Sequence, residues 1–375
     1  MQPLAIAEAF YESLESSSTE IEQARRLPQP LADQMAAAGL FRMVVPECYG
    51  GLQAHPWDYI QTLAYIAEAD ASAGWNLMIG TTTSLLSATL EPQWAKNIYA
   101  DHPDVITVGV TAPIGQAEPQ ADGSLIVSGR WPFGSGCQIA DWICGGCFLD
   151  VGEAHPQPTL VFFKPEEVTI HDTWDTSGLC GTGSHDIEVQ NVHVPAGRYV
   201  QLGGRPKVDA PLYRFPTFGL LALGVSAVSL GIANRAVKEF VELAGAKTPT
   251  GASRSLANRP SVQKDLAQAQ TALAAATALT RERIEAAYAQ AAAGQRMSTK
   301  TKAGLRQAAA NNAWSAASCV DTLYHAAGGS SIYKRSLLQK CFRDVHVTTQ
   351  HIMVGQPIYE VVGKVMLGLD PKQPL

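Results

Sequence analysis

Residues 175–195 read DTSGLCGTGSHDIEVQNVHVP, a glycine-rich turn that leads directly into a segment of alternating apolar and polar residues. A dinucleotide-binding turn of similar composition needs a strand before it and a helix after it. Here residues 186–195 alternate like a strand, so the glycines between Gly178 and Gly183 are expected in a tight turn within a β region. The stretch therefore argues against a Rossmann-type loop and predicts a sheet.

The segments that flank this turn support the same interpretation. They are short, rich in β-branched and aromatic residues, and bounded by Gly, Pro, Asp or Asn: residues 105–113, 123–133, 141–149 and 159–165. No helical segment separates them, so a doubly wound parallel sheet is disfavoured. We expect an antiparallel sheet or barrel in the middle of the chain.

Helical patterns lie on both sides of this β region. Residues 57–70 place apolar side chains at helical spacing, and residues 72–90 continue in the same way. Toward the C-terminus, four long alanine-rich helices are expected at 217–246, 259–293, 299–327 and 335–366, which form a four-helix bundle. The predicted fold class is α+β, with a helical domain at 1–104, a β domain at 105–212 and a bundle at 213–375.

Composition limits the function classes. Hydrophobic residues make up 46% of the 375 residues and the net charge is −6, so global disorder and a nucleic-acid-binding surface are both disfavoured. Seven scattered cysteines, an odd number, indicate a reducing compartment, and we expect a cytoplasmic protein. The uncharged run at 215–234 contains proline, glycine and serine, so we interpret it as a buried bundle helix and not as a membrane span.

Several residues match catalytic or metal-binding patterns only in part. Cys144 and Cys147 have zinc-site spacing, but a second ligand pair is missing and both lie in an apolar strand, so core cysteines are favoured. Ser135 and Ser184 lack the sequence context of a hydrolase nucleophile. The segment Trp131-Pro-Phe-Gly-Ser-Gly is either a turn with packed aromatic rings or a flat platform with Ser135 beside a ligand.

The segment at 343–351 carries Arg343, Asp344 and two histidines within an otherwise apolar part of the predicted bundle. If the helix continues through it, Asp344 and His351 lie within ~20° of one face, whereas His346 points elsewhere. A histidine on a bundle helix is by default a satisfied structural residue. Buried charges are costly unless they are paired, so this stripe is also a candidate functional site.

Four ordered motifs resemble the acyl-CoA dehydrogenase superfamily over nearly the whole chain. They are VPECYGGLQA at 45–54, GSLIVSGRWPFGSGCQIADW at 123–142, DTSGLCGTGSHDIEVQNVHVP at 175–195 and HAAGGSSIYKRSLLQKCFRDVH at 325–346. In many dehydrogenases of this family a Glu nine residues after the Arg of the Arg-Asp pair is the base. Here that position is Ile352, and no acid occurs between Asp344 and Glu360. Glu242, on an earlier helix, has unpersuasive surroundings.

His351 stands next to the position where the base is missing. A histidine at this place resembles the two-component flavin monooxygenase branch of the superfamily. The resemblance implies reduced FAD or FMN from a separate NAD(P)H-flavin reductase, O2 as co-substrate, and hydroxylation of a small indole- or phenol-like substrate through a C4a-hydroperoxyflavin. It also implies a homotetramer. Thr83 stands where several members carry a histidine that contacts a phenolic oxygen. An acyl-CoA dehydrogenase is the alternative, a non-catalytic relative is a third hypothesis, and an oxygenase acting on an amino sugar is a variant of the first.

The same resemblance assigns residues. His351 and Ser135 are the expected catalytic residues. Arg254 is the family-like cation for the flavin phosphate and Arg343 is a second candidate. The full set of expected flavin-binding residues is Trp131, Phe133, Ser135, Gly136, Arg254, Gln263, Gly328, Gly329 and Arg343.

Overall fold

The computed structural model describes residues 2–150 and 157–375, and these form two compact units. Unit 1 consists of Met1–Tyr59, Trp75–Thr176 and Cys180–Arg214, and unit 2 of Ile60–Gly74, Ser177–Leu179 and Phe215–Leu375. Each unit is described by itself below. The division into domains at 104/105 and 212/213 stays a prediction.

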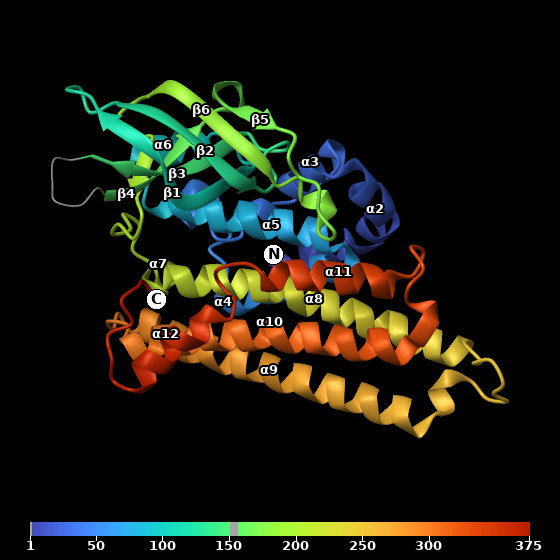
Figure 1. Ribbon diagram of the computed structural model, residues 1–375. Coiled ribbons are helices and arrows are strands. Elements are labelled where there is room, and N and C mark those ends of the chain that lie inside the picture. Colours follow the sequence, from blue (N-terminus) through green and yellow to red (C-terminus); the bar gives the residue numbers. More distant parts are fainter. Residues whose placement is uncertain (1, 151–156) are drawn as a thin grey trace. The chain divides into compact units, whose positions relative to one another are not determined.

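The first hundred residues are helical (Figure 1). The second helix ends at Ala24, because Arg25 takes a left-handed conformation with a φ of 52°. Pro28 is the N-cap of the third helix and Pro30 lies in its first turn, where the missing N–H has no helical partner to lose. The helices are α1 (Pro3–Glu8), α2 (Tyr11–Ala24), α3 (Gln29–Ala37), α4 (Pro56–Ala69), α5 (Ala71–Ser84) and α6 (Pro92–Ala95), with shorter turns η1 (Leu40–Arg42), η2 (Glu47–Tyr49), η3 (Leu85–Ala88) and η4 (Lys96–Ala100).

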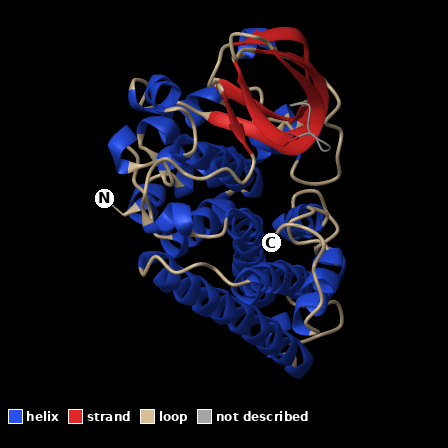
Figure 2. Cartoon of the chain, turned by 90° about the vertical axis from the view of Figure 1, so that its left-hand side faces the viewer, coloured by secondary structure: helices blue, strands red, loops and turns tan. Residues whose placement is uncertain are grey.

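Unit 1 is built on a seven-stranded sheet in the order β5-β6-β2-β1-β3-β4-β7. Figure 2 shows the strands curving around one another like an open barrel. The bounds are β1 (Thr107–Pro119), β2 (Leu125–Gly134), β3 (Trp142–Leu149), β4 (Gln157–Phe163), β5 (Thr169–His171), β6 (His185–Val194) and β7 (Tyr199–Gln201), with η5 (Pro165–Glu167) and η6 (Cys180–Thr182) between strands. As predicted, the turn that holds Gly181 and Gly183 is followed by a strand and not by a helix.

The expectation of a purely antiparallel sheet is wrong for one pair, because β1 and β3 run parallel. β2 pairs with one edge of β1, and residues 135–141 then carry the chain to the other edge, so β3 enters in the direction of β1. Alternation within a strand cannot reveal this crossing. The pair is close: a Cβ on Gly146 would lie 2.5 Å from the Ala112 carbonyl oxygen.

The core of unit 1 joins its helical residues to its sheet. Tyr99 and Phe162 are among the largest fully buried side chains. One apolar cluster contains Val45, Leu90, Ala95, Ile98 and Tyr99 from the helical part and Cys144, Leu160, Phe162 and Val200 from the strands. Cys144 and Cys147 are both buried on β3, as expected for core cysteines.

Unit 2 is a helical bundle in which α8, α9, α10 and α11 run side by side (Figure 1). Its helices are α8 (Thr217–Ala246), α9 (Pro260–Ala292), α10 (Thr299–Ala327), α11 (Leu337–Thr349) and α12 (Pro357–Met366), with the short turns η7 (Leu256–Asn258) and η8 (Gly328–Ser330). The preceding short helix, α7 (Pro211–Arg214), belongs to unit 1. α8 is, in the described part of the chain, the one helix long and apolar enough to cross a membrane, and 72% of its most apolar window is buried. That burial is typical of a core helix.

The single helix expected at 335–366 is wrong, because it is interrupted between α11 and α12. Thr349 is the last residue of α11, and Pro357 begins α12 at a position where its missing N–H costs nothing. Residues 350–356 form a turn, in which the amides of Val354 and Gly355 donate to the His351 carbonyl oxygen. His351 therefore lies in a turn and not on a helix face shared with Asp344.

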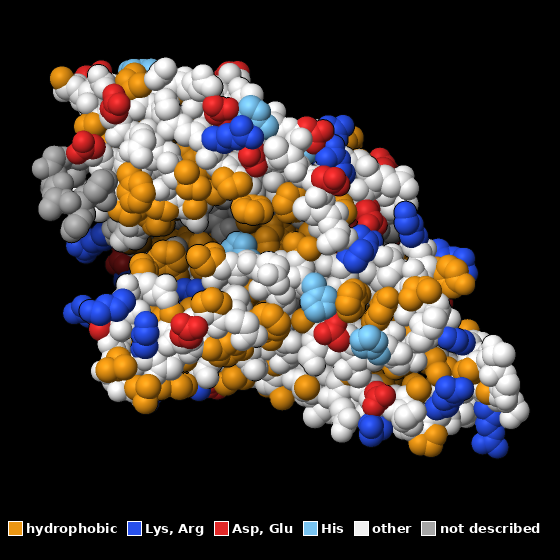
Figure 3. All heavy atoms as spheres, in the orientation of Figure 1, with side chains coloured by type: hydrophobic (Ala, Val, Ile, Leu, Met, Phe, Trp, Pro, Cys, Tyr) orange, Lys and Arg blue, Asp and Glu red, His pale blue; other side chains and the backbone are white. Residues whose placement is uncertain are grey.

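Neither sign of charge dominates the face shown in Figure 3. Basic and acidic side chains are interspersed there, with apolar side chains between them. This distribution is consistent with the small net charge of −6.

Candidate functional site

In unit 1, the end of β2 presents an exposed aromatic ring. Phe133 is 67% exposed, although large apolar side chains are normally buried, and its backbone has a φ of 66°. Its ring meets Trp174 edge to face, with 6.3 Å between centroids. Trp131, two residues earlier, is fully buried and donates from Nε1 to the Gly146 carbonyl oxygen at 2.6 Å, so its ring belongs to the core.

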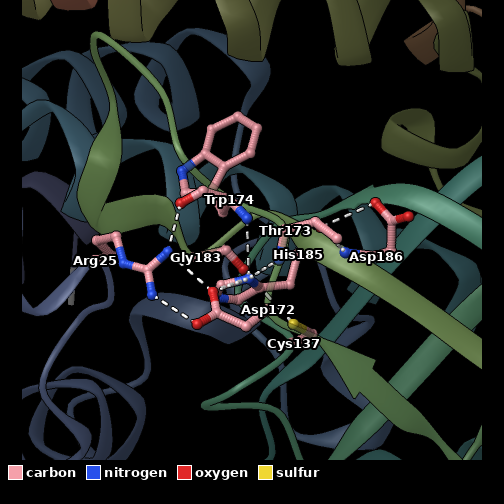
Figure 4. A network of polar contacts seen from close by, with 8 residues as sticks. All are labelled: Arg25, Cys137, Asp172, Thr173, Trp174, Gly183, His185 and Asp186. Atoms are coloured by element: carbon pink, nitrogen blue, oxygen red, sulfur yellow. Dashed lines mark hydrogen bonds and ion pairs between the residues drawn. The ribbon is translucent and has the colours of Figure 1, made fainter.

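A polar network fixes the segment that carries Trp174 (Figure 4). The Arg25 guanidinium donates to the Trp174 carbonyl oxygen at 2.8 Å and pairs with Asp172, which lowers the pKa of that carboxyl. His185, at the start of β6, accepts the backbone amide of Trp174 at Nδ1, and burial lowers the pKa of its imidazole. Segment 172–174 is thereby fixed to the strand next to β2.

A series of hydrogen-bonded hydroxyl groups begins at Ser135, two residues after Phe133. Trp75 Nε1–H donates to Ser135 Oγ at 3.1 Å, Ser135 Oγ lies 2.6 Å from Ser184 Oγ, and Ser184 Oγ lies 2.7 Å from Thr182 Oγ1. All four residues are buried. Because Trp75 can only donate, Ser135 is an acceptor in that bond and its own proton is directed elsewhere. Sequence reasoning identified Ser135 but missed Trp75 and Thr182, which come from distant segments without a common spacing.

Asn76, which follows Trp75, forms a further hydrogen bond to the glycine-rich turn. Its side-chain amide donates to the Gly181 carbonyl oxygen at 3.2 Å, while its Oδ1 atom is buried without a partner. Gly136 follows Ser135 with a φ of 74°, and a Cβ there would lie 3.3 Å from Asn76 Oδ1. An unused buried acceptor beside a glycine that brings backbone close is typical of a ligand site.

In unit 2, α11 is tied to the turn at 177–179 by its Arg-Asp pair. Asp344 accepts the Leu179 backbone amide at 2.6 Å and the Lys340 ammonium at 2.7 Å. Arg343 donates from Nη1 to the Ser177 carbonyl oxygen, so its guanidinium is engaged in this turn. Only glycine fits at Gly178, since a Cβ would lie 2.5 Å from the Arg343 carbonyl oxygen.

His351 occupies the turn after α11. Its Nδ1 atom accepts the Met353 backbone amide at 3.2 Å, so in the neutral ring the proton is on Nε2. Burial, and second the positive charge of Arg306, lower the pKa of the imidazole to about 4. His351 is therefore a neutral hydrogen-bond donor near pH 7.

The other expected residues of unit 2 lie on its surface or at a helix end. Arg254 is exposed in the segment before η7, and Gln263 donates from its exposed side chain to the Ala257 carbonyl oxygen at 2.9 Å. Gly328 and Gly329 follow α10, and Gly328 has a φ of 59°. In unit 1, Thr83 lies on α5 and donates to the Ile79 carbonyl oxygen at 2.9 Å.

The residues at the end of β2 fit a flavin ring. An isoalloxazine needs an apolar surface for its face and hydrogen-bonding groups along its edge. Phe133 offers the exposed surface, and Ser135 offers a hydroxyl group two residues later. The orphan Asn76 Oδ1, on α5, offers an acceptor beside Gly136.

Comparison with known proteins places this chain in a family. The models of the N-terminal and C-terminal domains of acyl-CoA dehydrogenases match residues 5–92 and 223–356. Indole-3-acetate monooxygenase from Pseudomonas putida is 33% identical over 352 residues, which cover 94% of this chain and 90% of that protein. The FADH2-dependent resorcinol hydroxylase oxygenase component from Rhizobium sp. is 25% identical, covering 95% and 92%.

The solved structure of 3-HSA hydroxylase from Rhodococcus sp. RHA1 matches with a TM-score of 0.92 and 25% identity, covering 99% of this chain and 97% of that one. Helices, a mixed sheet and a helical C-terminal part thus define an acyl-CoA dehydrogenase-type flavoprotein. The chain belongs to the acyl-CoA dehydrogenase family, and within it to the flavin-dependent monooxygenases. The resemblance inferred from the four motifs is confirmed.

Proposed function

We propose that the protein is the oxygenase component of a two-component system that hydroxylates a small indole- or phenol-like aromatic. A separate NAD(P)H-flavin reductase supplies the reduced FAD or FMN. The observation that carries this proposal is His351, a neutral imidazole in a chain segment that holds no carboxylate between Asp344 and Glu360. An acyl-CoA dehydrogenase needs a base at this point, and a histidine of low pKa that donates a proton from Nε2 is a poor one.

Bound reduced flavin would supply the electrons that activate O2, and one oxygen atom of that O2 would then be transferred to the aromatic ring. Ser135 is proposed to donate to the flavin edge. If Thr182 donates to Ser184 and Ser184 to Ser135, the Ser135 proton is left for a ligand atom. Because Ser135, Ser184 and Thr182 are buried, bulk water does not compete for that proton.

His351 is proposed as the second contact with the reacting atoms. A neutral imidazole held by the Met353 amide presents an N–H to an oxygen atom without adding a charge. Arg254, and not Arg343, is the favoured cation for the flavin phosphate, since it is exposed whereas Arg343 donates to the Ser177 carbonyl.

We also propose a cytoplasmic homotetramer. All seven cysteines are free, which suits a reducing compartment. Met366, Leu367 and Leu369 are 57–78% exposed at the C-terminal end of unit 2, and such apolar groups favour burial against another subunit. Light scattering should report four times the 40.0 kDa of one chain; a monomer would contradict this part of the proposal.

The roles of Ser135 and His351 are tested by product formed per flavin oxidised, with a reductase present. We expect His351→Ala and Ser135→Ala each to lower this yield by about 10²-fold, the size of a positioned proton donor. His346→Ala, on the same helix as Asp344 and paired with Asp321, serves as control. An unchanged yield in either test variant would remove that residue from the mechanism.

A further inference from the structure

Arg306, on α10, differs from every other buried basic residue that the structure describes. Four Lys or Arg residues are buried, and three of them have a carboxylate within 3 Å: Arg198 with Glu167, Arg235 with Glu239 and Lys340 with Asp344. Arg306 is 5% exposed and has no acidic partner within residues 2–150 and 157–375. It donates from Nη2 to the Met353 carbonyl oxygen at 3.3 Å, and its Nε–H is enclosed without an acceptor.

This arrangement is costly in the protein alone. A buried charge without a counter-charge destabilises a fold, because the lost hydration is not replaced. Burial lowers the pKa of Arg306 only to about 10, so the guanidinium stays charged at neutral pH. A binding site for an anion explains why the cation is retained.

The position of Arg306 indicates which anion. It holds the Met353 carbonyl oxygen, and Met353 in turn donates its amide to His351. Its charge also acts on the His351 imidazole. Arg306 is thus next to the residue proposed to act on the reacting atoms. In a small aromatic acid the carboxylate lies within a few bonds of the ring that reacts, whereas the phosphate of a flavin is separated from its ring by the whole ribityl chain.

We propose that Arg306 binds the carboxylate of an aromatic acid, so that the substrate is an anionic indole- or phenol-type acid and not its neutral counterpart. The planar guanidinium can hold a carboxylate through two parallel hydrogen bonds, for which the orphan Nε–H is one donor. This inference rests on the proposed function, since it names the substrate class of that site.

The test compares each acid with a neutral analogue that lacks the carboxylate. The pairs are indole-3-acetate with 3-methylindole and 4-hydroxyphenylacetate with 4-methylphenol. Binding to the full-length protein is measured by equilibrium dialysis with reduced FMN, without oxygen, so no turnover is needed. We expect at least one acid to bind more tightly than its analogue. Arg306→Gln should weaken that acid by about 10- to 100-fold and leave the neutral analogue within about twofold.

Two further variants separate recognition from folding. Arg306→Lys keeps the positive charge but cannot form the two parallel hydrogen bonds of a guanidinium, so it should recover part of the affinity for the acid. Arg283→Gln, which removes an exposed guanidinium on α9, should leave both ligands unaffected. Thermal melts of each variant show whether it folds, and Arg306→Lys provides the comparison if Arg306→Gln does not.

Three results would overturn the inference: neither acid binds more tightly than its analogue, Arg306→Gln weakens acid and analogue equally in a folded protein, or the variant weakens FMN relative to riboflavin and not the acid. The proposed function fails separately. Selective binding of the acid without any oxygen transfer once O2 is admitted would contradict the monooxygenase reaction and leave the carboxylate site standing.

Discussion

At the scale of single residues, His351 and Ser135 share one property: each has its acceptor atom occupied by a fixed donor. The Met353 amide occupies Nδ1 of His351, and the Trp75 indole N–H donates to the Ser135 hydroxyl oxygen. The remaining proton of each residue is therefore directed by the protein and not by solvent. Preorganised donors of this kind cost no reorganisation when charge develops on a reacting oxygen.

The low pKa of His351 predicts how stability changes with pH. In the unfolded chain a histidine titrates near 6.5, whereas in the folded protein His351 titrates near 4. Between these values the unfolded state binds the extra proton, so the free energy of unfolding falls as the pH is lowered through this window. At 1.36 kcal/mol per pKa unit, we expect a loss of roughly 2–3 kcal/mol between pH 7 and pH 4.5 from this residue.

Urea unfolding at the two pH values checks this expectation. His351→Asn should lose less stability on acidification than the parent protein, by about that amount. His346→Asn, which removes a partly exposed histidine, is the matched control. An equal loss in parent and His351→Asn would mean that His351 has an ordinary pKa, and the argument for a neutral donor would fail.

At the scale of elements, α11 is fixed by a buried charge network. Lys340 lies between Asp344, at 2.7 Å, and Asp70, at 3.6 Å, and Asp70 also accepts the Ala73 amide at the start of α5. Asp344 holds the Leu179 amide. One lysine thereby connects three separate segments of unit 2, and the turn that carries His351 follows directly from this helix.

Lys340→Met should destabilise the protein by about 3–5 kcal/mol, because it removes the positive charge that pairs with the buried Asp344 carboxylate at 2.7 Å. Lys264→Met, on α9, removes an exposed lysine that pairs with Asp265 and should change stability by less than about 0.5 kcal/mol. Chemical unfolding of both variants measures the difference. If the two variants are equally stable, the network is not what holds α11.

The sequence predicted the elements better than their connections. Strand alternation identified β2 and β6, and the spacing of apolar residues identified α8 and α10 with the correct ends. The break after Thr349 was missed although Gly355 and Pro357 signal it, because the apolar pattern resumes beyond them. The parallel pairing of β1 and β3, and the contact of Trp75 with Ser135, depend on how distant segments meet, which local patterns do not encode.

At the scale of the whole molecule, the fold alone does not choose the reaction. Acyl-CoA dehydrogenases and flavin-dependent monooxygenases share this architecture, as the family models and the relatives together illustrate. We propose that the choice depends on a few groups: the residue at Ile352, where the resemblance to dehydrogenases would place a base, and the neutral His351 beside it. Sequence comparison within one superfamily could find these positions; the tautomer of His351 and the unpaired Arg306 needed the structure.

The most direct test of the monooxygenase assignment is to follow an oxygen atom. The protein is mixed with chemically reduced FMN or FAD and an indole or phenol substrate in buffer equilibrated with 18O2, with catalase present, and the product is analysed by mass spectrometry. We predict one 18O atom in each hydroxylated product, without any reductase in the mixture. No incorporation across both substrate classes, together with bleaching of tightly bound oxidised FAD by an acyl-CoA, would contradict the account and return the protein to the dehydrogenases.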